Sequence, residues 1–66
     1  MKFKEFDNVK VKKDCIKGIS KGDIGTIVIV FDKPREAYEV EFLDEYGHTK
    51  AQCVFLPNEL EPVEIG

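Results

Sequence analysis

Apolar and polar residues alternate along much of the chain with the period of two that is typical of half-buried β-strands. The clearest stretch alternates three apolar residues with two acidic ones: Tyr38, Glu39, Val40, Glu41 and Phe42. A shorter stretch, 8–12, alternates valines with lysines in the same way. Helical periodicity is nearly absent, so the pattern predicts strands rather than helices.

The segment 26–31 (TIVIVF) differs because both of its faces are apolar. Alternation predicts one face made of Ile27, Ile29 and Phe31, and another made of Val28 and Val30. Both faces must be covered, because apolar surface is unfavourable in water. A long, bent strand in a small barrel achieves this, and a partner subunit would achieve it too.

Turn-forming residues separate the strands. Glycine and serine concentrate in 15–23, the charged segment 32–36 is typical of a hairpin tip, and 44–47 (DEYG) predicts a type I turn followed by a bulged glycine. The segment 56–60 (LPNEL) predicts one turn of 3₁₀ helix. Pro62 follows in a short last strand, which we expect either at a sheet edge or as a stub that closes the barrel, because proline cannot donate to the ladder.

These elements predict an all-β fold: a small five-stranded SH3-like barrel with a 3₁₀ turn before the last strand, formed by residues 1–66 as one domain. The expected core consists of the inward-facing residues Val9, Val11, Ile27, Ile29, Tyr38, Val40, Phe42, Leu56 and Leu60. Phe3 and Phe6 precede the first strand without alternating. We expect one of them to plug the end of the core and the other to lie over an edge.

The stretch 8–31, which contains KGDIGTIVIV and is followed by the return strand EVEF, resembles the KOW-type element of ribosomal and transcription-factor barrels. The resemblance implies that Gly25 permits a tight approach into the second strand. The whole chain resembles a family of short bacterial proteins, domain of unknown function 4926, through GDIGTIVIVF, YEVEFLDEYGHT and the LPNELEPV ending. This second resemblance implies the fold and a bacterial or archaeal origin, and it brings no activity with it.

Composition favours a soluble globular domain. Of the 66 residues, 42% are hydrophobic and 35% are charged, and no run approaches a transmembrane helix. The basic N-terminal segment has no apolar run behind it, which predicts a cytoplasmic protein. A catalytic pocket would compete with the core for the few apolar side chains, so we expect a non-enzymatic protein without a cofactor.

Cysteine and histidine form no recognisable site. Cys15 and Cys53 lie 38 positions apart without a CxxC motif, and a disulfide between them is disfavoured in a reducing compartment. We expect Cys53 in or near the core and Cys15 in a loop. His48 falls in the predicted hairpin turn, where we expect it to be exposed. The sequence therefore predicts no metal ligands and no catalytic residues.

Charge is divided unevenly along the chain. Residues 1–25 carry a net charge of +3 and residues 26–66 a net charge of −6. Five lysines lie on the first strand and the loop after it: Lys10, Lys12, Lys13, Lys17 and Lys21. They define an alternative hypothesis, a KOW-like module that binds RNA or DNA. Nearby acids, the lack of arginine in this segment and the overall charge of −3 weaken a phosphate-binding field, so nucleic acid ranks second.

The first hypothesis is a protein-interaction module, acting as an accessory subunit or as an antitoxin-like or immunity-like inhibitor. The residues expected to bind the partner are Val28, Val30, Phe31, Glu39, Glu41 and Tyr46. The acidic strand face would steer a basic partner. Apolar side chains left exposed on 26–31 would form either a homodimer contact or a partner contact. If Phe3 or Phe6 covers this strand instead, we expect a monomer. No membrane contact is expected.

Overall fold

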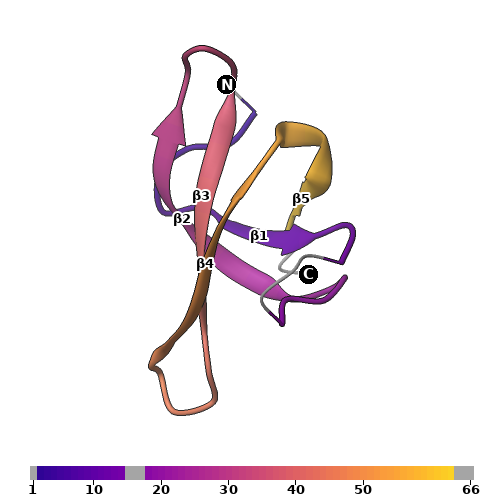
Figure 1. Cartoon of the computed structure of the whole chain (residues 1–66), viewed down its shortest axis with the longest axis vertical. Helices are drawn as coiled ribbons and strands as arrows, with labels where there is room; N and C mark the ends of the chain where they lie inside the picture. The colour runs from indigo at the N-terminus through magenta and orange to yellow at the C-terminus, as the bar shows by residue number, and fades with distance from the viewer. Residues whose placement is uncertain (1, 15–17, 64–66) are drawn as a thin grey trace.

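A computed structural model describes residues 2–14 and 18–63, and within them the chain forms five β-strands and one 3₁₀ turn (Figure 1). The strands are β1 (Asn8–Val11), β2 (Ile24–Phe31), β3 (Ala37–Leu43), β4 (Thr49–Phe55) and β5 (Leu60–Pro62). The 3₁₀ turn η1 (Pro57–Glu59) lies between β4 and β5. The predictions of an all-β fold, of five strands and of a 3₁₀ turn before the last strand are confirmed.

The five strands form one antiparallel sheet with the order β4-β3-β2-β1-β5. In Figure 1, β1 runs across the view, whereas β3 and β4 run along its vertical axis, so the sheet is strongly curled. The first residues of β2 pair with β1, and the later residues pair with β3. The long strand β2 therefore joins the part of the sheet that contains β1 to the part that contains β3, as its two apolar faces predict. The Pro62 strand lies at an edge, also as predicted.

A β-bulge exchanges the inward and outward faces of β2. Ile27 pairs with Val40, and Ile29 pairs with Glu39. Two steps along β2 therefore correspond to a single step along β3. One extra residue therefore lies on β2. Beyond it, Val30 packs against the core and Ile29 is exposed. The predictions that Ile29 shares the face of Ile27 and belongs to the core were wrong, because strict alternation does not anticipate an inserted residue.

The inward faces of the strands meet in one hydrophobic core. Its buried members are Phe3, Val9, Val11, Ile19, Ile27, Tyr38, Val40, Phe42, Cys53, Phe55 and Leu60. The predicted core residues are among them, apart from Ile29 and from Leu56, which is only half-buried where the chain leaves β4 for η1. The placement of Cys53 in the core is confirmed, and that of Cys15 lies outside the described residues.

Phe3 closes one end of the core, as expected for one of the two N-terminal phenylalanines. Its ring packs edge-on against the Tyr38 ring, with centroids 5.4 Å apart, and its N–H donates to the Tyr38 hydroxyl at 3.1 Å. That hydroxyl donates to the carboxylate of Glu36, which also accepts the Lys2 N–H at 2.9 Å. Phe6 is exposed and does not bury the outward side chains of β2.

The turn between β3 and β4 is organised by Asp44. One oxygen of its carboxylate accepts the N–H groups of Tyr46 and His48, both at 2.9 Å. Gly47 has a φ of 84° and donates its N–H to the Asp44 carbonyl at 3.0 Å. The predicted turn with a left-handed glycine is confirmed, and His48 is exposed in it as expected.

Candidate functional site

The outer face of the sheet, the side turned away from the core, carries a polar row across four strands. Register places Asn8, Thr26, Glu41 and Gln52 side by side in this row. The Thr26 hydroxyl donates to the Asn8 side chain at 3.0 Å, and Gln52 donates to the Glu41 carboxylate at 3.3 Å. Thr49 also donates to Glu41 at 3.0 Å. The side chains of the polar row therefore form hydrogen bonds with one another.

The neighbouring row on the same face is different, and we call it the Glu39 row. It consists of Ile29 on β2, Glu39 on β3 and Val54 on β4, because Glu39 pairs with both of the others. Ile29 is 42% exposed and Val54 is 57% exposed, while Glu39 is half-buried between them. Within residues 2–14 and 18–63, the Glu39 side chain makes no ion pair or hydrogen bond. The Glu39 row is thus an apolar strip with an uncompensated carboxylate at its centre.

The residues predicted to bind a partner do not all lie on this strip. Glu39 does, and Phe31, 36% exposed, follows Ile29 on the same strand. Val28 is half-buried at the bulge, and Val30 packs against the core instead of facing a partner. Glu41 belongs to the polar row described above.

Tyr46 is the remaining residue predicted to bind a partner, and it is 78% exposed in the β3–β4 turn. Phe31 pairs with Ala37 at the other end of β3. A strand of this length spans roughly 20 Å, and Figure 1 shows the β3–β4 turn at the end of the molecule opposite the β2–β3 loop. Tyr46 therefore lies apart from the exposed apolar side chains of β2.

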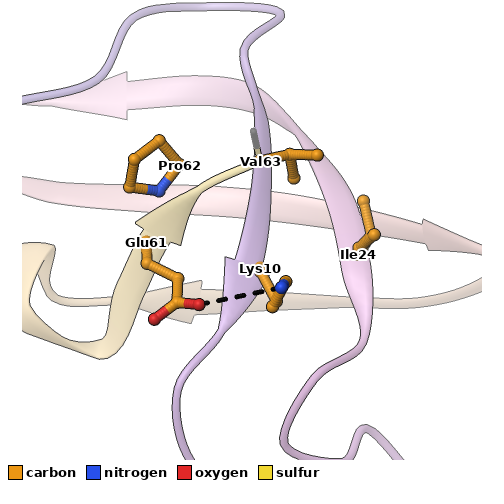
Figure 2. Close-up of a pocket in the computed structure, with 5 residues that line it drawn as sticks. All are labelled: Lys10, Ile24, Glu61, Pro62 and Val63. Carbon is orange, nitrogen blue, oxygen red and sulfur yellow. Dashed lines mark ion pairs between the residues drawn. The ribbon is translucent and has the colours of Figure 1, made fainter. Parts of the chain in front are cut away.

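Three lysines of the predicted basic cluster, Lys10, Lys12 and Lys21, line two open hollows beside β1. Figure 2 shows Lys10 between Glu61 of β5 and Ile24 of β2, with Pro62 and Val63 completing the lining. A second hollow beside it adds Lys12 and Lys21. The register of β1 with β2 and β5 brings these residues together from three parts of the sequence.

Carboxylates from distant parts of the chain neutralise part of this basic segment. Lys10 lies 3.9 Å from Glu61, and Lys13 lies 2.6 Å from Glu59. The prediction that Lys17 contributes to the same cluster lies outside the described residues. The charge division seen along the sequence is therefore mixed in space at this end of the sheet, which weakens an attractive field for phosphate.

Two carboxyl groups have lowered pKa values because they accept hydrogen bonds. The Lys13 ammonium, and then the Leu56 N–H at 2.8 Å, hold the pKa of Glu59 below its ordinary value of 4.5. The Tyr38 hydroxyl, and then the Lys2 N–H, lower the pKa of Glu36 in the same way. Burial, and then the neighbouring Glu36 carboxylate, raise the pKa of Tyr38 above its ordinary value of 10.0. These hydrogen bonds fasten η1 and the N-terminal segment to the sheet.

Stability is expected to decline at both ends of the pH scale. Where a folded-state pKa is lowered, the unfolded chain binds more protons, so the free energy of unfolding falls as pH drops below about 4.5. Where it is raised, as for Tyr38, stability is lost as pH rises above about 10. Urea unfolding measured from acid to alkaline pH tests both declines. Replacing Glu59 by glutamine should lower the free energy of unfolding by about 1 kcal/mol at neutral pH and make its decline in acid less steep. If the free energy of unfolding falls as steeply in acid for that variant as for the unmodified chain, the Glu59 carboxylate does not contribute to the decline.

Other chemistry finds little support in the described chain. Residues 2–14 and 18–63 contain no group of three or more histidine, cysteine, aspartate or glutamate side chains arranged to hold a metal ion. The same part of the chain contains no helix that is long and apolar enough to cross a membrane. The feature that stands out is the Glu39 row on the outer face.

Sequence reasoning missed Val54 and missed the partnership of Ile29 with Glu39. Val54 has a weak signal, because the alternation of β4 puts the buried Cys53 and Phe55 on one face and leaves Val54 as an apolar residue on the other. The partnership has no local signal, since it depends on how the bulge sets the register between β2 and β3.

Comparison with known proteins identifies a family but no characterised relative. No curated protein and no solved structure matches the chain. A family model described as "Domain of unknown function (DUF4926)" matches residues 5–62, from before β1 to the end of β5. The chain therefore belongs to this family of domains of unknown function.

Proposed function

We propose that the protein is a non-enzymatic protein-interaction module that docks a partner protein on the outer face of β2, β3 and β4. The observation that supports this proposal is the Glu39 row, in which two exposed aliphatic side chains flank a carboxylate that no described residue neutralises. One residue of the predicted acidic face, Glu39, lies beside one exposed residue of the apolar segment 26–31, Ile29. Exposed apolar side chains gathered on one face are a common mark of an interface.

The role we infer is that of an accessory subunit or an antitoxin-like or immunity-like inhibitor in the bacterial cytoplasm. Both roles require only that the module cover part of a partner's surface, which suits a 66-residue chain. A net charge of −3 favours a partner with a basic surface, because complementary charge accelerates encounter and selects partners.

A homodimer through the same face is a weaker explanation. An interface with two-fold symmetry brings the same patch of both copies together, so a dimer whose axis passes through the centre of the Glu39 row would place the two Glu39 side chains near each other without a counter-charge. Like charges at an interface cost free energy. Binding of RNA or DNA through Lys10, Lys12 and Lys21 is the remaining alternative, and the ion pair of Lys10 with Glu61 counts against it.

The proposal is tested by capturing partners from an extract of the source organism with the tagged full chain. The variant Ile29→Ser/Val54→Ser removes both exposed aliphatic side chains of the Glu39 row. We expect it to weaken capture of a partner about tenfold or more, because buried apolar contacts at an interface are each worth about 1 to 2 kcal/mol.

The matched control is Lys12→Ala/Lys21→Ala, which alters the lysine-lined hollow instead. We expect this variant to retain the partner. Circular dichroism verifies that both double variants are folded. If Lys12→Ala/Lys21→Ala loses the partner while Ile29→Ser/Val54→Ser retains it, the partner binds the lysine-lined hollow and not the Glu39 row. So would binding to generic RNA that falls steeply with salt, which is the signature of phosphate contacts.

A further inference from the structure

Resting on the proposed function, we propose that the Glu39 row recognises a basic side chain, lysine or arginine, presented by the partner between apolar residues. The carboxylate of Glu39 would bind the charged head, and the aliphatic side chains of Ile29 and Val54 would contact its hydrocarbon stem and the flanking apolar residues. The proposal names the chemistry that the partner must carry at the centre of the interface.

The register gives the geometry of this site. Glu39 lies directly opposite Ile29 on one side and Val54 on the other, and cross-strand neighbours have Cβ atoms roughly 5 Å apart. Three adjacent side chains therefore present an aliphatic, an acidic and an aliphatic group in a line across three strands. Lysine and arginine match such a line, because they combine an apolar stem with a cationic head.

Within the described strands, the carboxylates other than Glu39 are Glu41 and Glu61, and both already have partners, as do several carboxylates beside the sheet. Glu41 accepts hydrogen bonds from Thr49 and Gln52, and Glu36 accepts them from Tyr38 and Lys2. Lysines lie near three more: Asp23, Glu59 and Glu61. Glu39 is half-buried between aliphatic side chains and has no such partner in residues 2–14 and 18–63.

This arrangement favours a cation as the occupant. A carboxylate that loses water to a partner surface must gain a hydrogen-bonded counter-charge, or binding is penalised. A purely apolar partner would bury Glu39 without compensation, and an acidic one would add repulsion. A basic side chain gives the carboxylate a charge-assisted hydrogen bond, which is stronger than a neutral one. The same face therefore selects against partners that lack a cation at this position.

The experiment is an NMR titration of the ¹⁵N-labelled full chain with three peptides. The first is acetyl-Leu-Arg-Leu-Arg-Leu-amide, and the other two carry glutamine or glutamate in place of both arginines. We expect the arginine peptide to shift the amide signals of Ile29, Glu39 and Val54. We expect the glutamine peptide to bind about tenfold more weakly and the glutamate peptide more weakly still.

Two variants assign the effect to one carboxylate. Glu39→Gln should remove the preference for arginine over glutamine. Glu45→Gln removes the same charge from the β3–β4 turn, at the other end of the strand, and should keep the preference. A preference that survives in Glu39→Gln would overturn the proposal, because the arginine would then be bound elsewhere.

The remaining outcomes separate this inference from the proposed function. If the arginine and glutamine peptides bind equally and both shift Ile29 and Val54, recognition of a cation is overturned while docking on this face stands. If no peptide shifts these signals at millimolar concentration, recognition of a basic segment is overturned, and partner capture with Ile29→Ser/Val54→Ser decides the proposed function independently. Sedimentation at increasing concentration tests whether the free chain associates with itself. Self-association through this face would overturn the basic partner as the occupant of the Glu39 row, in favour of a second copy of the chain.

Discussion

Replacing Phe42 by alanine is expected to leave the chain largely unfolded at room temperature. Phe42 is 2% exposed, and its ring packs edge-on against that of Phe55, with centroids 6.1 Å apart. Removing a buried phenylalanine costs roughly 3 to 5 kcal/mol. A folded chain of this size has a total stability of only about 3 to 10 kcal/mol, so a single cavity removes a large fraction of it, and all of it towards the lower end of that range.

Leu43 provides the matched control for this experiment. It is the next residue on β3 but points to the outer face, and it is exposed. Leu43→Ala should change the free energy of unfolding by less than about 1 kcal/mol. Urea denaturation followed by circular dichroism compares the two variants. A Phe42→Ala chain as stable as Leu43→Ala would show that the core does not close as described.

Alternation in the sequence predicted β3 well because β3 is regular. Its inward residues Tyr38, Val40 and Phe42 are all buried, and its outward glutamates are only half-buried. The turn at Asp44 was equally predictable, since its hydrogen bonds join residues close in sequence. Local chemistry is sufficient where the structure depends on neighbours along the chain.

The outer face could not be predicted in the same way. Glu39 was recognised as a candidate for a docking surface, but its neighbours Ile29 and Val54 are set by the register of three strands. The bulge in β2 reverses the facing of Ile29 and Val30, and a one-residue change of phase moves a side chain to the opposite face of a sheet. The ion pairs that neutralise Lys10 and other lysines likewise join residues far apart in the sequence.

The second large effect is expected at Gly25, the residue whose small size the KOW-like resemblance singled out. Its backbone packs so closely on β3 that a Cβ atom would lie 2.6 Å from Val40 Cγ1, 2.8 Å from the Glu41 carbonyl oxygen and 2.9 Å from Phe42 Cδ1. The contact with Glu41 is the most severe of the three, because a backbone oxygen cannot rotate away as a side chain can. Gly25→Ala must therefore displace β2 from β3, at a cost of about 2 to 3 kcal/mol.

Gly18 separates this close approach from the general effect of replacing a glycine. It has a φ of +78°, and a Cβ atom added there would meet no other atom within 4 Å, so Gly18→Ala should cost only the backbone strain of about 1 kcal/mol. Urea unfolding compares the two alanine variants with the unmodified chain. Because β2 carries Ile29 to its place opposite Glu39, Gly25→Ala should also broaden or shift the NMR signals of the Glu39 row, whereas Gly18→Ala should leave them in place. Equal stability losses in the two variants would mean that β2 does not approach β3 as closely at Gly25 as these contacts require.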